Sequence, residues 1–153
     1  MICISRFLFA ILILSSCAGR SLTDVERNEL YQNYVIENKL EQLKSITSFR
    51  FDGWRELGKE HLIIFTSIRK PYLITLKNRC ADLRFSNTLG INKTGNSLHA
   101  NFDSIFVLSF PQQKCFIKSI HKLTREQANQ MSDLDEPGKE QAAKESSPKD
   151  ANG

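Results

Sequence analysis

The spacing of apolar residues predicts a long helix in the first third of the chain. Between Arg20 and Ile46 these residues recur mostly at steps of three and four, the spacing of one face of an amphipathic helix. Thr23, followed three residues later by Glu26, has the form of a capping box and predicts the start of the helix. We expect the helix to pack on its own domain; the alternatives are a lever and a docking face for a partner.

After this helix the apolar spacing changes to two, and β-branched and aromatic residues become frequent, which predicts strands. The expected strands are 49–51, 61–68, 72–77, 98–110 and 114–123. The unbroken apolar run from Leu62 to Phe65 indicates a strand buried on both faces. Between residues 81 and 96 the pattern is less regular, and Leu83, Phe85 and Leu89 are expected to point inward. The predicted fold class is mainly β (α+β), a small antiparallel sheet or barrel of about five to six strands with an N-terminal helix.

The end of the chain is polar. Thr124 to Gln127 repeats the capping-box form and predicts a short helix that ends near Met131. From Ser132 to Gly153 there is almost no apolar residue, and six acidic residues stand against three lysines. We expect this tail to be disordered.

The first residues have the layout of an exported lipoprotein. Arg6 and the free amine precede the apolar run from Phe7 to Leu14, as in a signal peptide. Leu14, Ser15, Ser16 and Cys17 then fill every position of a lipobox, in which the cysteine thiol receives a diacylglyceryl group before cleavage. We therefore expect residues 1–16 to be removed and Cys17 to carry the lipid, with palmitate among the acyl chains.

Two alternatives to lipidation stay open. Cleavage after Ala18 would secrete the protein without lipid, and retention of residues 2–18 would give a membrane span, although the apolar run is shorter than the ~20 residues a span needs. Ala18, in place of Asp, after the lipidated cysteine is typical of proteins sorted to the outer membrane. The expected location is the bacterial envelope, facing the periplasm. The expected units are an anchor and helix (17–47), a β domain with a short helix (48–131) and the tail (132–153).

The expected location predicts the chemical state of each cysteine. Cys3 is lost with the signal and Cys17 carries lipid, so Cys80 and Cys115 are an even pair in an oxidising compartment. We expect them to form a disulfide. A metal site is the weaker alternative, because neither cysteine lies in a C-x-x-C pair and no histidine stands beside them at ligand spacing.

Several short motifs, in their order and spacing, resemble a family of small proteobacterial lipoproteins known as domain of unknown function 6491. They are Asp52-Gly53-Trp54 before Leu57-Gly58, Tyr72-Leu73 in a strand that ends at Cys80 with Leu83 close behind, Phe102-Asp103 before Ile105 to Val107, and Cys115-x-Ile117 running to Ile120 and Leu123. The resemblance covers about residues 49–124. It implies a compact, mostly β domain behind a lipobox with Cys80 and Cys115 paired, and it implies no activity, cofactor or catalytic residue.

Charge suggests a partner class. Residues 48–123 contain twelve Lys or Arg against five Asp or Glu, a net charge of +7. A basic domain at a membrane could contact anionic headgroups, lipopolysaccharide phosphates or an acidic envelope protein. The alternative is a solvated basic surface, because the charges are scattered through the strands. Nucleic acid does not fit the expected compartment.

Candidate chemistry is sparse. His61, His99 and His121 are isolated from one another in the sequence and match no metal-binding motif. Asp52 and Asp103 could be paired carboxylates, but an Asp before Gly is also ordinary turn chemistry, and Asp103 could satisfy backbone groups at a strand bend. No cofactor motif is present, and no cofactor or metal is expected.

Trp54 is expected to be a core residue packed against Phe51, Ile64 or Tyr72; an exposed indole would instead make it a contact residue. The candidate binding residues are Trp54, Asp52, Tyr72 and Asp103. The sequence favours a non-catalytic binding or structural module of the envelope. The alternatives are a periplasmic protein inhibitor, similar in architecture to lysozyme inhibitors, and a small enzyme that uses Asp52, Asp103 or a histidine.

Overall fold

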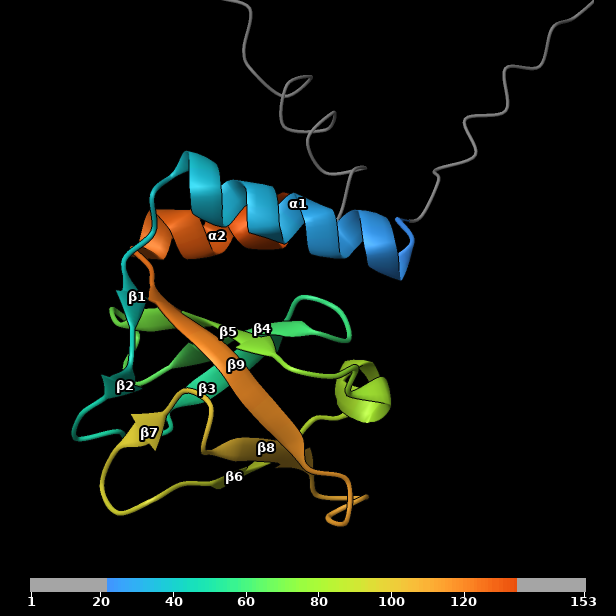
Figure 1. Cartoon of the computed structure of the whole chain (residues 1–153), viewed down its shortest axis with the longest axis vertical. Helices are drawn as coiled ribbons and strands as arrows, with labels where there is room; N and C mark the ends of the chain where they lie inside the picture. The colour runs from blue at the N-terminus through green and yellow to red at the C-terminus, as the bar shows by residue number, and fades with distance from the viewer. Residues whose placement is uncertain (1–21, 135–153) are drawn as a thin grey trace, which may run out of the picture.

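The computed structural model describes residues 22–134. They form a curled antiparallel sheet with two helices side by side along one of its faces (Figure 1). Neither helix of this described part has the length and apolar composition needed to cross a bilayer. The predictions for the signal, for Cys17 and for the tail beyond Leu134 lie outside the described residues.

Helix α1 (Asp24–Glu37) begins at the predicted capping box. The Thr23 hydroxyl accepts a hydrogen bond from the Glu26 amide at 3.3 Å, and the Glu26 carboxylate accepts one from the Thr23 amide at 2.8 Å. These two bonds satisfy amide groups that a helix start otherwise leaves without partners. The prediction of the helix start is therefore confirmed.

The predicted end of this helix at Ile46 is wrong. The Asn38 side-chain amide donates to the Tyr34 carbonyl at 2.9 Å, and Lys39 follows with a left-handed φ of 47°, a conformation that ends an α-helix. The apolar residues after this point are used by strands β1 (Gln42–Leu43) and β2 (Ser45–Ile46). Leu40, Leu43 and Ile46 lie three residues apart, so their spacing resembles a continued helix, although Leu43 and Ile46 belong to two separate strands.

Six strands of the seven-stranded sheet lie in the order β3-β4-β5-β9-β8-β6, and all neighbours are antiparallel. The remaining strands are β3 (Gly53–Glu56), β4 (His61–Phe65), β5 (Pro71–Leu76), β6 (Leu89–Asn92), β7 (Leu98–His99), β8 (Ser104–Val107) and β9 (Cys115–Lys122). β1 pairs with the end of β9, and β2 forms a separate pair with β7. No pairing among the described strands joins β3 to β6, so the sheet is curled and open. The predicted mainly β fold is confirmed.

The sheet separates two apolar cores. Leu62 and Ile64 point into the larger core, on the concave side of the sheet, whereas Ile63 points to the helices. All three are fully buried, which confirms that β4 is covered on both faces. Burying an aliphatic side chain of this size contributes about 1.5–3 kcal/mol.

Helix α2 (Arg125–Leu134) completes the layer that covers the sheet. It begins at the second predicted capping box, where the Gln127 amide donates to the Thr124 hydroxyl at 3.1 Å. It continues past the predicted end at Met131, which is itself fully buried in the smaller core. Ser132 to Leu134, which the sequence assigns to the tail, are therefore helical.

The predicted disulfide is confirmed. Cys80, after β5, is bonded to Cys115, the first residue of β9, with the two Cα atoms 5.9 Å apart. Both cysteines are buried in the larger core. Closing a loop of 35 residues stabilises the fold by about 3–4 kcal/mol in the chain-entropy model.

Three smaller predictions are wrong. Residues 98–110 form two strands and not one, because Asn101 adopts a left-handed φ of 70° and turns the chain between β7 and β8. Phe85 ends the short 3₁₀ helix η1 (Ala81–Phe85) and is 85% exposed, not inward. Residues 49–51 form no strand, and Gly53 and Trp54 begin β3 where a turn was expected.

Candidate functional site

A basic groove lies between the segment after β2 and the turn from β4 to β5. It consists of two adjoining depressions of about 430 Å³ and 370 Å³, which share Arg50, Ser67 and Lys70. The residues that line it are Ile46, Thr47, Ser48, Arg50, Asp52, Thr66, Ser67, Ile68, Arg69, Lys70 and Tyr72. We call this set the basic groove.

One wall of the groove is a tight turn. The Thr66 amide donates to the Lys70 carbonyl at 3.1 Å, and the Lys70 amide donates to the Ser67 carbonyl at 3.0 Å. This pattern closes the β4–β5 hairpin and leaves Ile68 and Arg69 exposed at its tip. The Arg-Lys pair before Pro71 is therefore displayed on the surface.

The other wall is fixed by a buried residue. Ser48 has a left-handed φ of 50° and reverses the chain after β2, and Phe49 then enters the larger core with 5% exposure. The Phe49 amide donates to the Asn96 carbonyl at 2.8 Å, which holds the segment in place. With Phe49 directed inward, Arg50 lies exposed in the groove.

The charge of the groove is positive. Arg50, Arg69 and Lys70 are exposed and form no ion pair with any residue between 22 and 134, while Asp52 lines one end. Hydroxyl groups of Thr47, Ser48, Thr66, Ser67 and Tyr72 surround the cations. Guanidinium, ammonium and hydroxyl donors in one hollow are the groups that bind phosphate and carboxylate oxygens.

Two of the predicted binding residues, Asp52 and Tyr72, lie in this groove. Trp54 does not line it; it pairs with Ile64 across β3 and β4, is half-buried, and packs against the larger core. Trp54 is thus part of the packing of the sheet, as expected, although less deeply buried than a central core residue.

Asp103, the remaining predicted residue, has a structural position. It is 3% exposed and accepts hydrogen bonds from the Thr94 amide at 3.1 Å, the Thr94 hydroxyl at 3.0 Å and the His99 amide at 2.6 Å. These bonds tie the turn after β6 to the bend between β7 and β8. No described interaction joins Asp103 to Asp52, so the structure lends no support to a carboxylate pair.

Two of the three histidines, which are far apart in the sequence, come together under the helices. His61 on β4 and His121 on β9 are both buried, on either side of β5, and the ring centroid of His61 lies 5.3 Å from that of Tyr31 on α1. Burial, with the nearby Lys118 and His121, lowers the pKa of His61 to about 4. Within residues 22–134, no three His, Cys, Asp or Glu side chains are grouped so that they could hold a metal ion.

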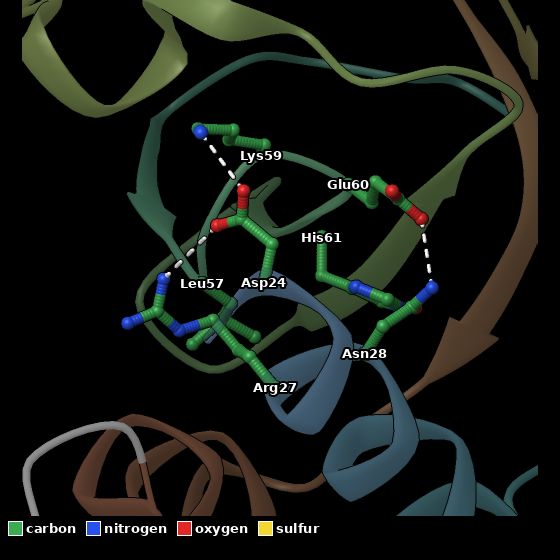
Figure 2. Close-up of a pocket in the computed structure, with 7 residues that line it drawn as sticks. All are labelled: Asp24, Arg27, Asn28, Leu57, Lys59, Glu60 and His61. Carbon is green, nitrogen blue, oxygen red and sulfur yellow. Dashed lines mark hydrogen bonds and ion pairs between the residues drawn. The ribbon is translucent and has the colours of Figure 1, made fainter. Parts of the chain in front are cut away.

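A second polar cluster lies where α1 begins, against the turn between β3 and β4 (Figure 2). Asp24 contacts Lys59 at 2.8 Å, and the Asn28 amide donates to the Glu60 carboxylate at 2.8 Å. The hydrogen bond from Lys59 lowers the pKa of Asp24. The enclosed volume is about 10 Å³, room for about one water molecule. This cluster is therefore a junction between helix and sheet, and not a ligand site.

Gly58 allows the junction to form. Its φ is 103°, and a Cβ atom at this position would lie 2.6 Å from Cδ of Arg27. Arg27 is 7% exposed and packs directly over this glycine. The turn at Gly58 is thus also the surface on which α1 rests.

The structure therefore defines a small, disulfide-linked β domain that carries a helical layer and a basic groove. The model of a family described as "Family of unknown function (DUF6491)" matches residues 1–138, and the chain belongs to this family. The match extends beyond the 49–124 stretch that carries the resemblance, and includes residues 1–48 and both helices. No match was found among curated proteins or among solved structures.

Proposed function

We propose that the protein is a non-catalytic envelope lipoprotein, in which acylated Cys17 holds the β domain at a membrane and the basic groove binds an anionic group. The leader sequence supports the anchor, because Leu14 to Cys17 fill every lipobox position. The groove carries the binding part of the proposal, because its three exposed cations are free of ion pairs with the described residues. The ligand class that fits them is a phosphate or carboxylate anion.

The groove sets an upper limit on affinity. Each exposed charge contact contributes only about 0.2–1 kcal/mol, so a single anion should bind weakly, with a dissociation constant on the order of millimolar or above. Ligands that present several anionic groups in a row gain affinity by engaging more than one cation. Binding should weaken as salt rises, because the contacts are exposed to solvent.

Catalysis has less support than binding. Asp103 is occupied by three hydrogen bonds to Thr94 and His99. His61 is buried beneath Tyr31 with a pKa near 4, away from the groove. Nδ1 of His99 lies 3.3 Å from Oδ2 of Asp103, but neither residue lines the basic groove.

The test is calorimetric titration of tripolyphosphate into a soluble form that begins at Ala18. Arg50→Gln with Lys70→Gln should weaken binding by about fivefold or more, because both cations line the shared part of the groove. Lys93→Gln with Lys114→Gln removes the same charge outside the groove and should change binding less than about twofold. Equal losses in the two variants would mean non-specific attraction and would reject the groove.

The anchor has a separate test. Mass spectrometry of the membrane-extracted protein should show a diacylglyceryl-modified N-terminus at Cys17. A soluble product that starts at Gly19 would reject the anchor.

A further inference from the structure

We infer that the end of the sheet left uncovered by the helices is a second binding surface, which docks on a lipid bilayer with anionic headgroups. Its apolar part consists of five large side chains on β8, at the start of β9 and in the two turns beside β8: Phe102, Phe106, Leu108, Phe110 and Phe116. We call this set the aromatic end. The inference depends neither on the lipid at Cys17 nor on the basic groove.

The two helices cover only part of the sheet face on which they lie. Cys115 and Ile117 on β9 both lie in the larger core, so Phe116 between them points to the other face, the one that carries the helices. Leu123, directly after β9, lies in the smaller core under the helices, whereas Phe116 is 41% exposed. In Figure 1, β6 and β8 lie at the opposite end of the sheet from α1 and α2. The helical layer therefore ends before it reaches Phe116.

Two phenylalanine rings share this uncovered face. Phe116 on β9 is the partner of Ser104 on β8, and Phe106 lies two residues farther along β8. Residues two apart in a strand point to the same face, so the two rings stand diagonally across a small serine side chain. Phe106 is paired with Gly90 on β6, where a Cβ atom would collide with the ring. Gly90 thus allows the ring of Phe106 to lie on the edge strand.

The turns on either side of β8 add the other three side chains. Before β8, the Asn101 amide donates to the Ile117 carbonyl at 2.8 Å, which holds Phe102 beside β9. After β8, the Phe110 amide donates to the carbonyl of the last residue of β8 at 2.9 Å, and this turn displays Leu108 and Phe110. Phe102 is 79% exposed, and Leu108 and Phe110 are each 54% exposed. Exposed apolar side chains gathered in this way mark an interaction site.

The charge around the aromatic end identifies the partner. Between Ser86 and Lys122 the sequence contains four lysines and one acidic residue, Asp103, which is buried. Lys114 and Lys118 are exposed and form no ion pair with any residue of the described part of the chain. Apolar and aromatic side chains next to free lysines are the groups with which a peripheral protein enters the headgroup layer of an anionic bilayer.

A second copy of the chain fits this surface less well. Two copies that meet through the aromatic end bring Lys114 and Lys118 of both into one interface, and no exposed acidic residue between Ser86 and Lys122 offsets them. Like charges repel more strongly as water is removed from between them. A bilayer avoids this repulsion, because its anionic headgroups neutralise the lysines while the rings enter the apolar layer.

The test is co-sedimentation with vesicles of the chain from Ala18 onward, which keeps every described residue and lacks the lipid. The vesicles contain about one third phosphatidylglycerol in phosphatidylcholine, so that their surface is anionic. Phe102→Ser with Phe110→Ser should lower the partition coefficient by about tenfold or more, because both exposed rings enter the bilayer. Val25→Ser with Ile36→Ser removes two exposed apolar side chains from α1 and should change it by less than about twofold.

Two further measurements separate insertion from adsorption. Phe102→Trp adds an indole at the aromatic end, and the natural chain, with Trp54 alone, supplies the background. The added emission should shift to shorter wavelength on binding and be quenched by phosphatidylcholine brominated on its acyl chains. Lys114→Gln with Lys118→Gln should weaken binding to the anionic vesicles by about fivefold or more.

Three outcomes overturn the inference. The natural chain could fail to bind the vesicles at low salt. The phenylalanine variant could bind as well as the α1 control, with the loss found instead in Arg50→Gln with Lys70→Gln, which would place the lipid contact in the groove. The phenylalanine variant could lose self-association in sedimentation velocity and keep its vesicle binding, which would make a second copy the occupant. None of these measurements uses tripolyphosphate, so failure here leaves anion binding by the groove standing, and failure of the groove titration leaves the aromatic end standing.

Discussion

The helical layer and the sheet differ in charge and in what they do with it. Helices α1 and α2 carry six acidic against two basic residues, whereas residues 42–122 carry thirteen basic against five acidic residues. Some of these opposite charges meet at the junction, as between Asp24 and Lys59. The cations of the basic groove, at the other end of β4, have no such partner among the described residues. The comparison separates charges that assemble the domain from charges available to a ligand.

The two regions also differ in how they are held together. The sheet is fixed by strand pairing, a large core and the disulfide, while the helices rest on the smaller core and a few polar contacts such as the Tyr34–Gln130 hydrogen bond. Tyr31 on α1 is fully buried in this smaller core. We therefore expect that substitutions can loosen the helical layer while the groove keeps its shape.

The largest expected effect is that of Tyr31→Ala, which removes the fully buried aromatic ring that fastens α1 to the sheet. Unfolding by urea should show a loss of about 3–5 kcal/mol. Val25→Ala, at an exposed position of the same helix, is the control and should change stability by less than about 0.5 kcal/mol. A small loss for Tyr31→Ala would mean that α1 does not depend on this packing.

The disulfide should come next, and it tests the sheet. Cys80→Ala with Cys115→Ala should lower the free energy of unfolding by about 3–4 kcal/mol, because the unfolded chain regains the entropy of a loop of 35 residues. Thermal melts with and without reductant provide an independent measure. Free thiol reactivity of both cysteines in the native, unreduced protein would show that the bond is absent.

Acid should weaken the contact between helix and sheet through His61. Its pKa is about 4 in the folded protein against 6.5 in an unfolded chain, so the unfolded state binds more protons between these values. Stability is therefore full above pH 6.5 and falls by about 3 kcal/mol as the pH decreases to 4. His61→Gln should flatten this part of the pH profile. If stability depends on pH in the same way after His61→Gln, another group causes the acid sensitivity.

The smallest effect concerns the turn under α1. Gly58→Ala places a Cβ at a φ of 103° and 2.6 Å from Cδ of Arg27, and should cost about 1–3 kcal/mol. Gly53→Ala is the matched control, because a Cβ there meets nothing within 4 Å. Equal costs in the two variants would contradict a special role for Gly58.

The sequence was sufficient to predict features that depend on residues close together in the chain or on the number of cysteines. The two capping boxes at Thr23 and Thr124, the buried run of β4 and the pairing of Cys80 with Cys115 are confirmed. The end of α1 was missed because Leu43 and Ile46 continue the apolar spacing, although strand pairing with β9 and β7 decides their structure. Tertiary pairing overrides local spacing there.

The groove could be predicted only in fragments. Asp52 and Tyr72 were named as candidate binding residues, and Arg69 and Lys70 fall between the expected strands 61–68 and 72–77. The approach of Arg50 to Lys70 was not predictable, since it depends on Phe49 entering the core and on the chain reversal at Ser48. The proximity of His61 and His121 was hidden for the same reason, because it arises from the register of β4 and β9 on β5.

The most direct test of the separation between assembling charges and ligand charges compares paired variants from the two regions in the titration with tripolyphosphate. Arg50→Gln with Lys70→Gln, in the groove, should weaken binding by about fivefold or more. Lys59→Gln with Arg79→Gln removes the same charge from cations that pair with Asp24 and Glu60, and should change binding by less than about twofold. Equal losses in the two variants would contradict the account.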